Sequence, residues 1–448
     1  MPATGFIMRK LKLLICMLLA CESASAATLT EAINAAGEWN SQYKAQKNAH
    51  LAGQEKWDQG LAGLLPTLQL EGNYTQQDQP SASYAAKVTR HNYSVNLSQP
   101  LFDVSKYADF MRGKALAKMA DVEFARAQQK LISDVSAAYF EVLYQREVLQ
   151  ASRAALQVYG RQLAQAKAAL ELGEGLRMDV DEAQANYDRA SSDQIAVTNA
   201  LDVAGISFQR LTGLDASSID AISERCATVA PVKDLKTLLM QSDADNLDIR
   251  YSTFQVAQTQ ADLTAAIGSQ MPVVNLQAGY GGNWSRGENE NVWDEVFGTT
   301  SKTRNTTVGV VVSVPLFSGG GQMSRAREAA YNRVQAKDLL EEARRKAQQD
   351  TRSAWLDITN GIALLRALHQ AVASAENKVK STEYGREMGL RSGLDELNAR
   401  QRYYDAVREL ADARYKLLKS RIQLLSVTGQ LGFSSINALT CRTASADS

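Results

Sequence analysis

Apolar residues recur at a strict seven-residue spacing in the stretch from Val135 to Leu170. The positions are Val135, Val142, Leu149, Leu156, Leu163 and Leu170. A heptad repeat that runs this far without a cap or a proline is typical of a coiled coil. The pattern stops at Gly173 to Gly175, and helical periodicity resumes at Met178. Because glycine readily adopts positive φ, we expect the chain to turn back there and to form a long helical hairpin.

On the N-terminal side of this hairpin, the period of the pattern changes from 3.6 to 2. Residues 29–63 have helical spacing, and Pro66 ends that segment. Alternating apolar and polar side chains then form two runs within 66–100, on either side of a polar stretch from Gln76 to His91. We therefore predict a helix followed by a pair of strands with one apolar and one polar face.

The whole plan occurs twice along the chain. A helix over about 233–268 precedes a second strand pair within 272–315 and a second hairpin within 318–429. Landmarks of the two copies lie 215 or 216 residues apart. The pairs are Pro100 and Pro315, Leu149 and Leu365, Gly173 and Gly389, Asp179 and Asp395, and Gly213 and Gly429. Agreement at strand ends, heptads and turns together predicts an internal structural repeat.

The repeat divides the chain into a signal peptide, a first repeat, a linker of less regular pattern, a second repeat and a tail. In that order, these parts are 1–26, 27–213, 214–232, 233–429 and 430–448. The helical hairpin of the first repeat is expected over 103–213.

The N-terminus has the three parts of an export signal. A basic segment at 9–12, an apolar run at 13–20 and the cleavage motif Ala24-Ser25-Ala26 follow one another. The apolar run is too short to span a bilayer. We favour cleavage after Ala26, because helical spacing starts again without a spacer. A second interpretation stays open, since residues 18–21 loosely resemble a lipobox that would leave a lipid on Cys21.

Export leaves two cysteines, Cys226 and Cys441, in an oxidising compartment. A disulfide between them is allowed there, but two thiols are not a disulfide framework, so the bridged and the free forms both stay open.

Charge and motif content narrow the functional class. Lys+Arg and Asp+Glu both number 49, and a chain without net positive charge does not suit a nucleic-acid partner. The histidines His50, His91 and His369 lie far apart and have no carboxylate or cysteine at ligand spacing. The sequence contains no phosphate-binding loop and no nucleophile motif. We expect no enzymatic activity, no cofactor and no metal.

The strands indicate a membrane location. After the signal peptide, no segment has the roughly 18 consecutive apolar residues of a membrane helix, so strands would have to cross the bilayer. Their alternation suits a transmembrane barrel, but four strands cannot close one and open strand edges cannot sit in lipid. Several chains would then share one barrel. A soluble periplasmic coiled-coil protein with two water-facing β-hairpins stays open as the alternative, because it has the same alternation.

The hairpins have to stand in water. A helix from about 104 to 171 would be on the order of 100 Å long, which is several bilayer thicknesses. Its apolar seam needs a partner, which other copies of the chain or the second repeat can supply.

Taken in order, these motifs resemble those of the TolC-like outer-membrane channels of Gram-negative bacteria, which serve efflux and type I secretion. The resemblance covers nearly all of the mature chain. The residues that carry it are Leu64-Leu65-Pro66, Pro100-Leu101-Phe102, Gly173 with Asp179 and Ala183, Leu211-Thr212-Gly213, Met271-Pro272, Pro315-Leu316-Phe317, Gly389 with Asp395 and Ala399, and Val427-Thr428-Gly429.

The resemblance implies an α+β membrane protein that forms a homotrimer. Three chains would build a 12-stranded transmembrane β-barrel continuous with a long periplasmic α-helical barrel, with an equatorial belt from 214–232 and the tail after Gly429. Such a channel sits in outer-membrane lipid and takes substrates from an inner-membrane translocase, of the ABC or RND type, through a periplasmic adaptor. The substrate would be a small drug or toxin, or an unfolded secreted protein.

In this family the hairpin tips constrict the tunnel and open when the partners dock. Arg391 and Asp395 match the family's tip arginine and first acid, and Asp179 matches an acid of the first tip. Asp395 would line the pore, where its three copies attract cations. The other interpretation is that Arg391 and Asp395, four residues apart, pair on an exposed helix.

Two positions depart from the family pattern at the second tip. The place of the second acid is taken by Asn398, and Arg386 replaces a tyrosine that often precedes the turn glycine. We therefore expect a weaker acidic constriction and a rewired closing network. The turns themselves are expected at Gly173, Gly175 and Gly389.

Overall fold

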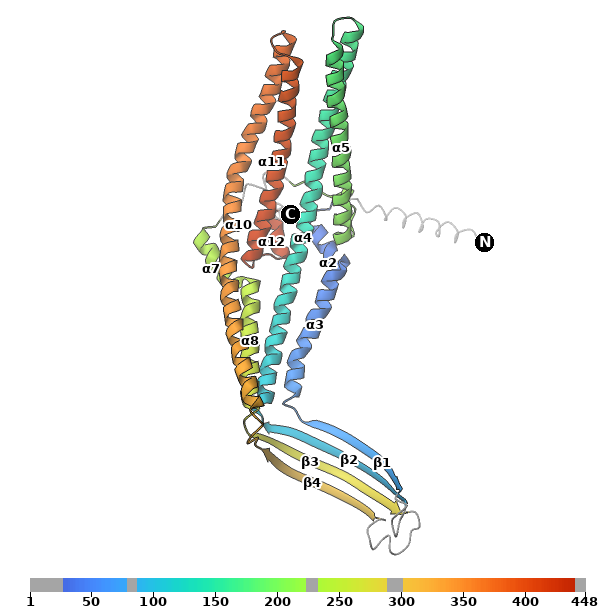
Figure 1. Cartoon of the computed structure of the whole chain (residues 1–448), viewed down its shortest axis with the longest axis vertical. Helices are drawn as coiled ribbons and strands as arrows, with labels where there is room; N and C mark the ends of the chain where they lie inside the picture. The colour runs from blue at the N-terminus through green and yellow to red at the C-terminus, as the bar shows by residue number, and fades with distance from the viewer. Residues whose placement is uncertain (1–26, 79–86, 223–232, 288–300, 440–448) are drawn as a thin grey trace, which may run out of the picture. The chain divides into compact units, whose positions relative to one another are not determined.

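The computed structural model describes residues 27–78, 87–222, 233–287 and 301–439 (Figure 1). The predictions of a signal peptide, of a possible lipid on Cys21 and of a possible disulfide between Cys226 and Cys441 concern positions outside these residues. The chain forms two compact units, and each unit takes segments from both repeats. The hairpin unit comprises Met1–Lys47, Ala125–Leu247 and Arg345–Ser448, and the sheet unit comprises Asn48–Phe124 and Asp248–Arg344.

The sheet unit contains one antiparallel sheet of four strands in the order β1-β2-β3-β4. The strands are β1 (Thr67–Asp78), β2 (Lys87–Phe102), β3 (Val273–Gly287) and β4 (Ser301–Ser313). Within the sheet, β2 of the first repeat pairs with β3 of the second, from Val88 opposite Gly287 to Phe102 opposite Val274. Among the residues that the structure describes, no strand pairs with the outer edge of β1 or of β4.

The strand register separates the side chains into two faces. One face is apolar and carries Leu68, Leu70, Val95, Leu97, Ala278, Tyr280, Val308 and Val310. The opposite face carries mostly Asn, Gln, Ser, Thr and Gly. Leu70 is 74% exposed and Val308 is 75% exposed, so the chain itself leaves its apolar sheet face uncovered. No helix within the described ranges is long and apolar enough to span a bilayer.

The helix that precedes each strand pair is broken by an asparagine. The structure divides the predicted helix 29–63 into α2 (Leu29–Trp39) and α3 (Ser41–Ala62), and the helix 233–268 into α7 (Leu235–Asp245) and α8 (Leu247–Gly268). Between them, Asn40 and Asn246 have extended backbones. The Asn40 side chain accepts a hydrogen bond from the Tyr43 amide at 3.0 Å, and Asn246 donates to the Val427 carbonyl at 2.8 Å. The prediction of one continuous helix was wrong in both repeats, because helical spacing persists on both sides of the break. Asn40 caps the next helix locally, whereas the Asn246 side chain bonds a distant carbonyl.

Four long helices form the two hairpins. They are α4 (Val104–Glu171), α5 (Arg177–Thr212), α10 (Gly321–Glu387) and α11 (Gly393–Val427). With 68 and 67 residues, α4 and α10 are each about 100 Å long at 1.5 Å per residue. A short 3-10 helix, η1 (Ala216–Ser218), follows α5, and α12 (Phe433–Leu439) follows α11.

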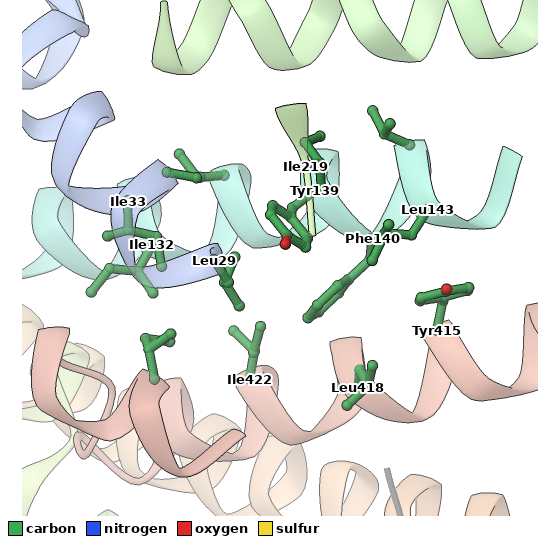
Figure 2. Close-up of a cluster of buried hydrophobic side chains, with 14 of the residues drawn as sticks. Leu29, Ile33, Ile132, Tyr139, Phe140, Leu143, Ile219, Tyr415, Leu418 and Ile422 are labelled. Carbon is green, nitrogen blue, oxygen red and sulfur yellow. The ribbon is translucent and has the colours of Figure 1, made fainter. Parts of the chain in front are cut away.

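The core of the hairpin unit joins the two repeats (Figure 2). Heptad positions Val135 and Val142 of α4 are fully buried. In the same cluster, Tyr139 and Phe140 lie among α11 residues, together with side chains from α2, α12 and the segment after η1. The residues from these neighbouring elements include Leu29, Ile33, Ile219, Tyr415, Leu418, Ile422 and Ile436. Of the two partners considered for the apolar seam, the second repeat occupies this part of it.

Polar contacts reinforce the same junction. Glu147 of α4 accepts hydrogen bonds from Arg414 at 2.9 Å and from the Tyr415 hydroxyl at 2.5 Å. Burial, together with the Glu147 carboxylate, raises the pKa of Tyr415 well above its ordinary value, so this hydroxyl remains a donor. The buried Tyr139 hydroxyl lies 2.7 Å from the Asp220 carbonyl and 3.1 Å from the Ala27 carbonyl. Tyr139 thereby ties α4 to the segments beside α2 and η1.

The Tyr139 hydroxyl provides a test of this junction. Tyr139→Phe is expected to lower the free energy of unfolding by about 1–2 kcal/mol, because the Asp220 carbonyl loses its hydrogen bond from the hydroxyl, whereas the Ala27 carbonyl keeps the Asp220 amide as a donor. Urea unfolding of the purified protein in detergent, followed by circular dichroism at helical wavelengths, measures the loss. Tyr144→Phe is the control, since the Tyr144 hydroxyl has no hydrogen bond within the described part of the chain. An equal loss in both variants would contradict a specific role for Tyr139.

Candidate functional site

The two hairpin tips have the same backbone geometry. Gly173 and Gly389 take φ values of +77° and +71°, in the left-handed region that favours glycine. In the first tip, the amides of Glu174 and Gly175 both donate to the Ala169 carbonyl. The amides of Leu390 and Arg391 donate in the same way to the Gly385 carbonyl. Figure 1 shows both tips at one end of the hairpin unit.

The sequence predicted Gly175 as a turn glycine that adopts positive φ. Its φ is not positive, so it has a different role in the turn. A Cβ atom on Gly175 would lie 3.0 Å from the Cβ of Ala169. In the second tip, Gly385 replaces this alanine and Arg391 replaces this glycine. A Cβ atom on Gly385 would lie 2.8 Å from the Cγ of Arg391. Each turn therefore needs one glycine in this contacting pair, and the second turn places it so that an arginine fits at the tip.

The two predicted acids, Asp179 and Asp395, both begin a helix. The Asp179 carboxylate accepts from the Leu176 amide at 3.2 Å. The Asp395 carboxylate accepts from the Ser392 amide at 3.2 Å and from the Ser392 hydroxyl at 3.0 Å, while the Ser392 Oγ accepts from the Asp395 amide at 3.1 Å. This is a capping box, and its sequence signature, Ser392 followed three residues later by an acid, was present but not used.

These contacts determine the charge of Asp395. Hydrogen bonds from the Ser392 amide and hydroxyl, with a smaller effect of the Arg391 guanidinium, hold the pKa of the Asp395 carboxyl below its ordinary value. The carboxylate is therefore ionised at neutral pH. It is also fully exposed in the single chain, so the cap leaves its charge accessible to solvent.

Arg391 and Asn398 are both exposed, but they lie on different elements. Arg391 belongs to the turn, because α10 ends at Glu387 and α11 begins at Gly393. The alternative in which Arg391 and Asp395 pair on one helix is therefore wrong. Asn398 lies on α11 and faces solvent.

The predicted residue Arg386 belongs to a network that sequence analysis missed. Its Nε atom lies 2.5 Å from Oε2 of Glu396, whose side chain is only 3% exposed. Arg400 donates from Nε to Oε1 of Glu396 at 2.9 Å and from a terminal nitrogen to Glu383 at 3.1 Å. We call these four residues, Glu383, Arg386, Glu396 and Arg400, the tip clasp. It joins the end of α10 to the start of α11.

The two arginines hold Glu396 in different ways. Arg400 makes an aligned hydrogen bond, whereas the Arg386 contact meets the distance of an ion pair without the alignment of a hydrogen bond. The Arg386 side chain is 40% exposed and that of Arg400 is 17% exposed. Arg400 is therefore the stronger partner. Two features of the sequence point to this network: the four-residue spacing of Glu396 and Arg400, and the arginine in place of tyrosine at 386. The burial of Glu396 follows only from the packing of α10 on α11.

Below the tips, the two hairpins are less tightly packed. A cavity of about 100 Å³ lies between α4, α5 and α11 and is lined by Tyr159, Asn186, Arg189, Gln401, Tyr404 and Arg408, among others. Nearer the core, Val135 and Val142 are fully buried, whereas Leu156 and Leu170 are only half-buried.

No group of three His, Cys, Asp or Glu side chains is placed to hold a metal ion in the part of the chain that the structure covers.

Comparison with known proteins identifies the family. The model of the family described as outer membrane efflux protein matches residues 27–214 and 238–430. The outer membrane protein TolC of Vibrio cholerae is 30% identical over 372 residues, which cover 83% of this chain and 83% of that protein. The proteases secretion protein PrtF of Dickeya chrysanthemi is 28% identical over 431 residues, which cover 91% of this chain and 89% of its own.

Solved structures show the same fold. The crystal structure of the outer membrane protein VceC from Vibrio cholerae superposes with a TM-score of 0.76 at 18% identity, covering 90% of this chain and 96% of that chain. The resemblance to TolC-like channels is thus confirmed, and the alternative of a soluble periplasmic coiled-coil protein is excluded. The fold is that of outer-membrane channels, with four strands for a β-barrel and long helices for a helical barrel.

Members of this family are channels rather than enzymes. The chain belongs to the outer membrane efflux protein family, and it is an outer-membrane exit channel with a large periplasmic portion.

Proposed function

We propose that three copies of this chain form the exit duct of a tripartite export system and that the second hairpin tip is its periplasmic gate. The observation that carries the trimer is the four-stranded sheet with two unpaired edges and an exposed apolar face. Open edges cannot lie in lipid, because their amides and carbonyls would lack partners there. Pairing β4 of one copy with β1 of the next removes every edge, and three copies supply 12 strands.

The partners are a periplasmic adaptor and an inner-membrane transporter of the ABC or RND type. The relatives include proteins named for protease secretion and proteins named for efflux. Both cargo classes therefore stay within the proposal, a small molecule or an unfolded polypeptide. The duct needs no chemistry of its own, since its partners supply the energy.

The gate is proposed at the tips because charge is concentrated there and is scarce on the polar sheet face. Among the described residues of that face, only Glu71 and Arg90 are charged. Ion selectivity is therefore expected to come from elsewhere in the duct. Asp395 is ionised, exposed and held by its cap at the tip, so three copies around an axis would attract cations.

The tip clasp makes α10 and α11 move as one body at their ends. Glu396 is bound from both helices, so separating the helices would leave a buried carboxylate without one of its partners. The cavity beside Tyr159 and Tyr404 shows where the two hairpins are loosely packed. We propose that opening displaces the second hairpin tip as a unit relative to the first, with the core around Tyr139 fixed.

The proposal also assigns a place to each part of the chain. The two repeats, 27–213 and 233–429, would form two similar halves of the duct wall. The segments 214–232 and 430–448 would form an equatorial belt around it. In support, Ile219, beside η1, and Ile436 of α12 are buried in the same core cluster as Leu29.

The tip clasp predicts a local stability effect. Glu396→Ala is expected to destabilise the second tip by about 2 kcal/mol, since it leaves Arg400 and Arg386 without their shared partner. Limited trypsin digestion of the purified protein should then cut between residues 386 and 402 several-fold faster. Glu387→Ala is the control, because it removes an exposed acid at the end of α10 that is not part of the tip clasp. Unchanged cleavage in the Glu396 variant would refute the clasp.

The gate predicts distinct effects for charge and for capping. Asp395→Asn keeps an oxygen that can accept from Ser392 but removes the charge, and it should lower the cation preference of single channels in planar bilayers. Arg391→Ser should raise the open probability, because it removes a charged side chain from the turn.

The cation preference of the wild-type channel should persist from pH 8 to about pH 5, because the lowered pKa keeps Asp395 ionised above the ordinary aspartate value of about 4. Wild-type conductance in both variants would place the gate elsewhere.

Partner docking predicts crosslinking at the tips. With Cys226 and Cys441 replaced by serine, a single cysteine at Arg177→Cys or Arg391→Cys should capture a periplasmic adaptor in intact cells through a bifunctional thiol reagent. A cysteine at Tyr331→Cys, an exposed position on α10 in the sheet unit, is the control. Capture at the control position alone would argue against docking at the tips.

A further inference from the structure

Four basic residues lie on the apolar face of the sheet, at the end away from the helices: Lys87, Arg286, Lys302 and Arg304. The last two belong to the edge strand β4. The register places Lys302 opposite Trp284 and Arg304 opposite Gly282, on the same side as Val308 and Val310. Both side chains are exposed. Lysine and arginine are expensive on a lipid-facing surface except near the interface, so their height on the strand decides what they contact.

Their height corresponds to the outer edge of the lipid. Lys302 lies ten residues from Val312 along β4, a distance of about 34 Å at 3.4 Å per residue. With the usual tilt of about 40°, this amounts to about 26 Å along the membrane normal, close to the roughly 25 Å of an apolar barrel band. The strand ends near Val312 continue into the periplasmic helices. By this estimate Lys302 lies at the outer edge of the band, and Arg304, two residues nearer Val312, lies about 5 Å inside it. Both long side chains can therefore reach the headgroups of the outer leaflet.

An aromatic row marks the same level. His91 lies between two aromatic rings, with its centroid 5.0 Å from that of Tyr74 and 4.5 Å from that of Trp284. The cross-strand pairs Tyr74 with His91, His91 with Trp284, and Trp284 with Lys302 place these four side chains in one row across the sheet. Rings of this kind are typical of the membrane interface.

The neighbouring row brings a hydroxyl toward Arg304. Tyr93 lies opposite Gly282, and a Cβ atom on Gly282 would come within 2.8 Å of the Tyr93 hydroxyl oxygen. The absence of a side chain at 282 thus lets the phenol ring lie across β3 in the direction of β4. Tyr93 and Arg304 thus flank Gly282 in one row of the apolar face, and Lys302 lies two residues from Arg304 along β4. These donors together suit a phosphate group, which arginine binds through two parallel hydrogen bonds.

We propose that Lys302, Arg304 and Tyr93 form a binding site for the phosphate groups of the phosphorylated glycolipid in the outer leaflet. This inference rests on the outer-membrane location and the strand register, and it does not depend on the gate. A protein contact is the competing explanation, because the segment 288–300, outside the described residues, contains Glu288, Glu290, Asp294 and Glu295.

The test measures glycolipid binding to the delipidated, detergent-solubilised full-length protein. Native mass spectrometry counts bound lipid while a bis-phosphorylated lipid A is titrated. Lys302→Gln with Arg304→Gln is expected to weaken binding about tenfold or more, and Tyr93→Phe alone a few-fold, because charge-assisted hydrogen bonds are lost. Lys302→Arg with Arg304→Lys should retain binding within a few-fold.

Arg90→Gln is the matched control. Arg90 lies at nearly the same height but on the opposite face, where it donates to Gln77 at 2.8 Å. This variant removes a positive charge without touching the proposed site, so it should bind the lipid like the wild type. Wild-type migration of each variant as a folded oligomer on a native gel precedes every titration. If the double variant does not assemble, the Tyr93→Phe and single Arg304→Gln variants decide the outcome.

Four results would overturn the proposal. Equal binding of lipid A without phosphates would remove the phosphate as the ligand, and full competition by millimolar inorganic phosphate would identify a free-anion site. An equal loss in Arg90→Gln would indicate a general charge effect. A large loss of stability in the lipid-free double variant, with unchanged lipid binding, would assign these residues to a protein contact.

Discussion

The contact between α4 and α11 is the interaction on which the rest of the hairpin unit depends. Tyr139 and Phe140 of the first repeat meet Tyr415 and Leu418 of the second in one buried cluster. Elements from the start, the middle and the end of the chain, including α2, η1 and α12, converge on this place. Within the hairpin unit, the two copies of the plan are thereby joined through contacts that neither copy makes within itself.

In the sheet unit the two repeats are also joined to each other, but by backbone hydrogen bonds instead of packed side chains. The β2–β3 ladder supplies these hydrogen bonds, and the alternation of side chains determines which face of the sheet is apolar. The two outer edges are left for further copies of the chain. The helical seam is buried within the chain near Val135 and Val142 but only half-buried at Leu156 and Leu170. Edge strands in lipid cannot satisfy their backbones without an assembly.

Much of this architecture was predictable from the pattern of side chains. The heptads located the buried face of α4, and the change of period located the four strands to within a few residues. Two of the three predicted turn glycines, Gly173 and Gly389, have the left-handed backbone that favours glycine, whereas Gly175 does not. The sequence prediction missed the breaks in the helices at Asn40 and Asn246. These breaks leave the helical period intact, and therefore periodicity does not reveal them.

The candidate site was predictable in place but not in its contacts. Asp179 and Asp395 do lie at the two tips, yet each also caps its helix, a role that spacing alone did not distinguish from pore lining. Glu396 was missed because its burial arises from the packing of two helices around the turn, with Arg386 and Arg400 as its partners. Sequence identifies which charges are near a turn, while tertiary packing decides which of them are shielded from water.

The paired positions of the two turns have an evolutionary consequence. The first tip contains Ala169 and Gly175, and the second contains Gly385 and Arg391, so the small residue has changed sides between the two repeats. A side chain fits at one position only where the other has none. The two positions of each tip are therefore expected to vary together: with this backbone, an arginine at position 175 would fit only beside a glycine at 169.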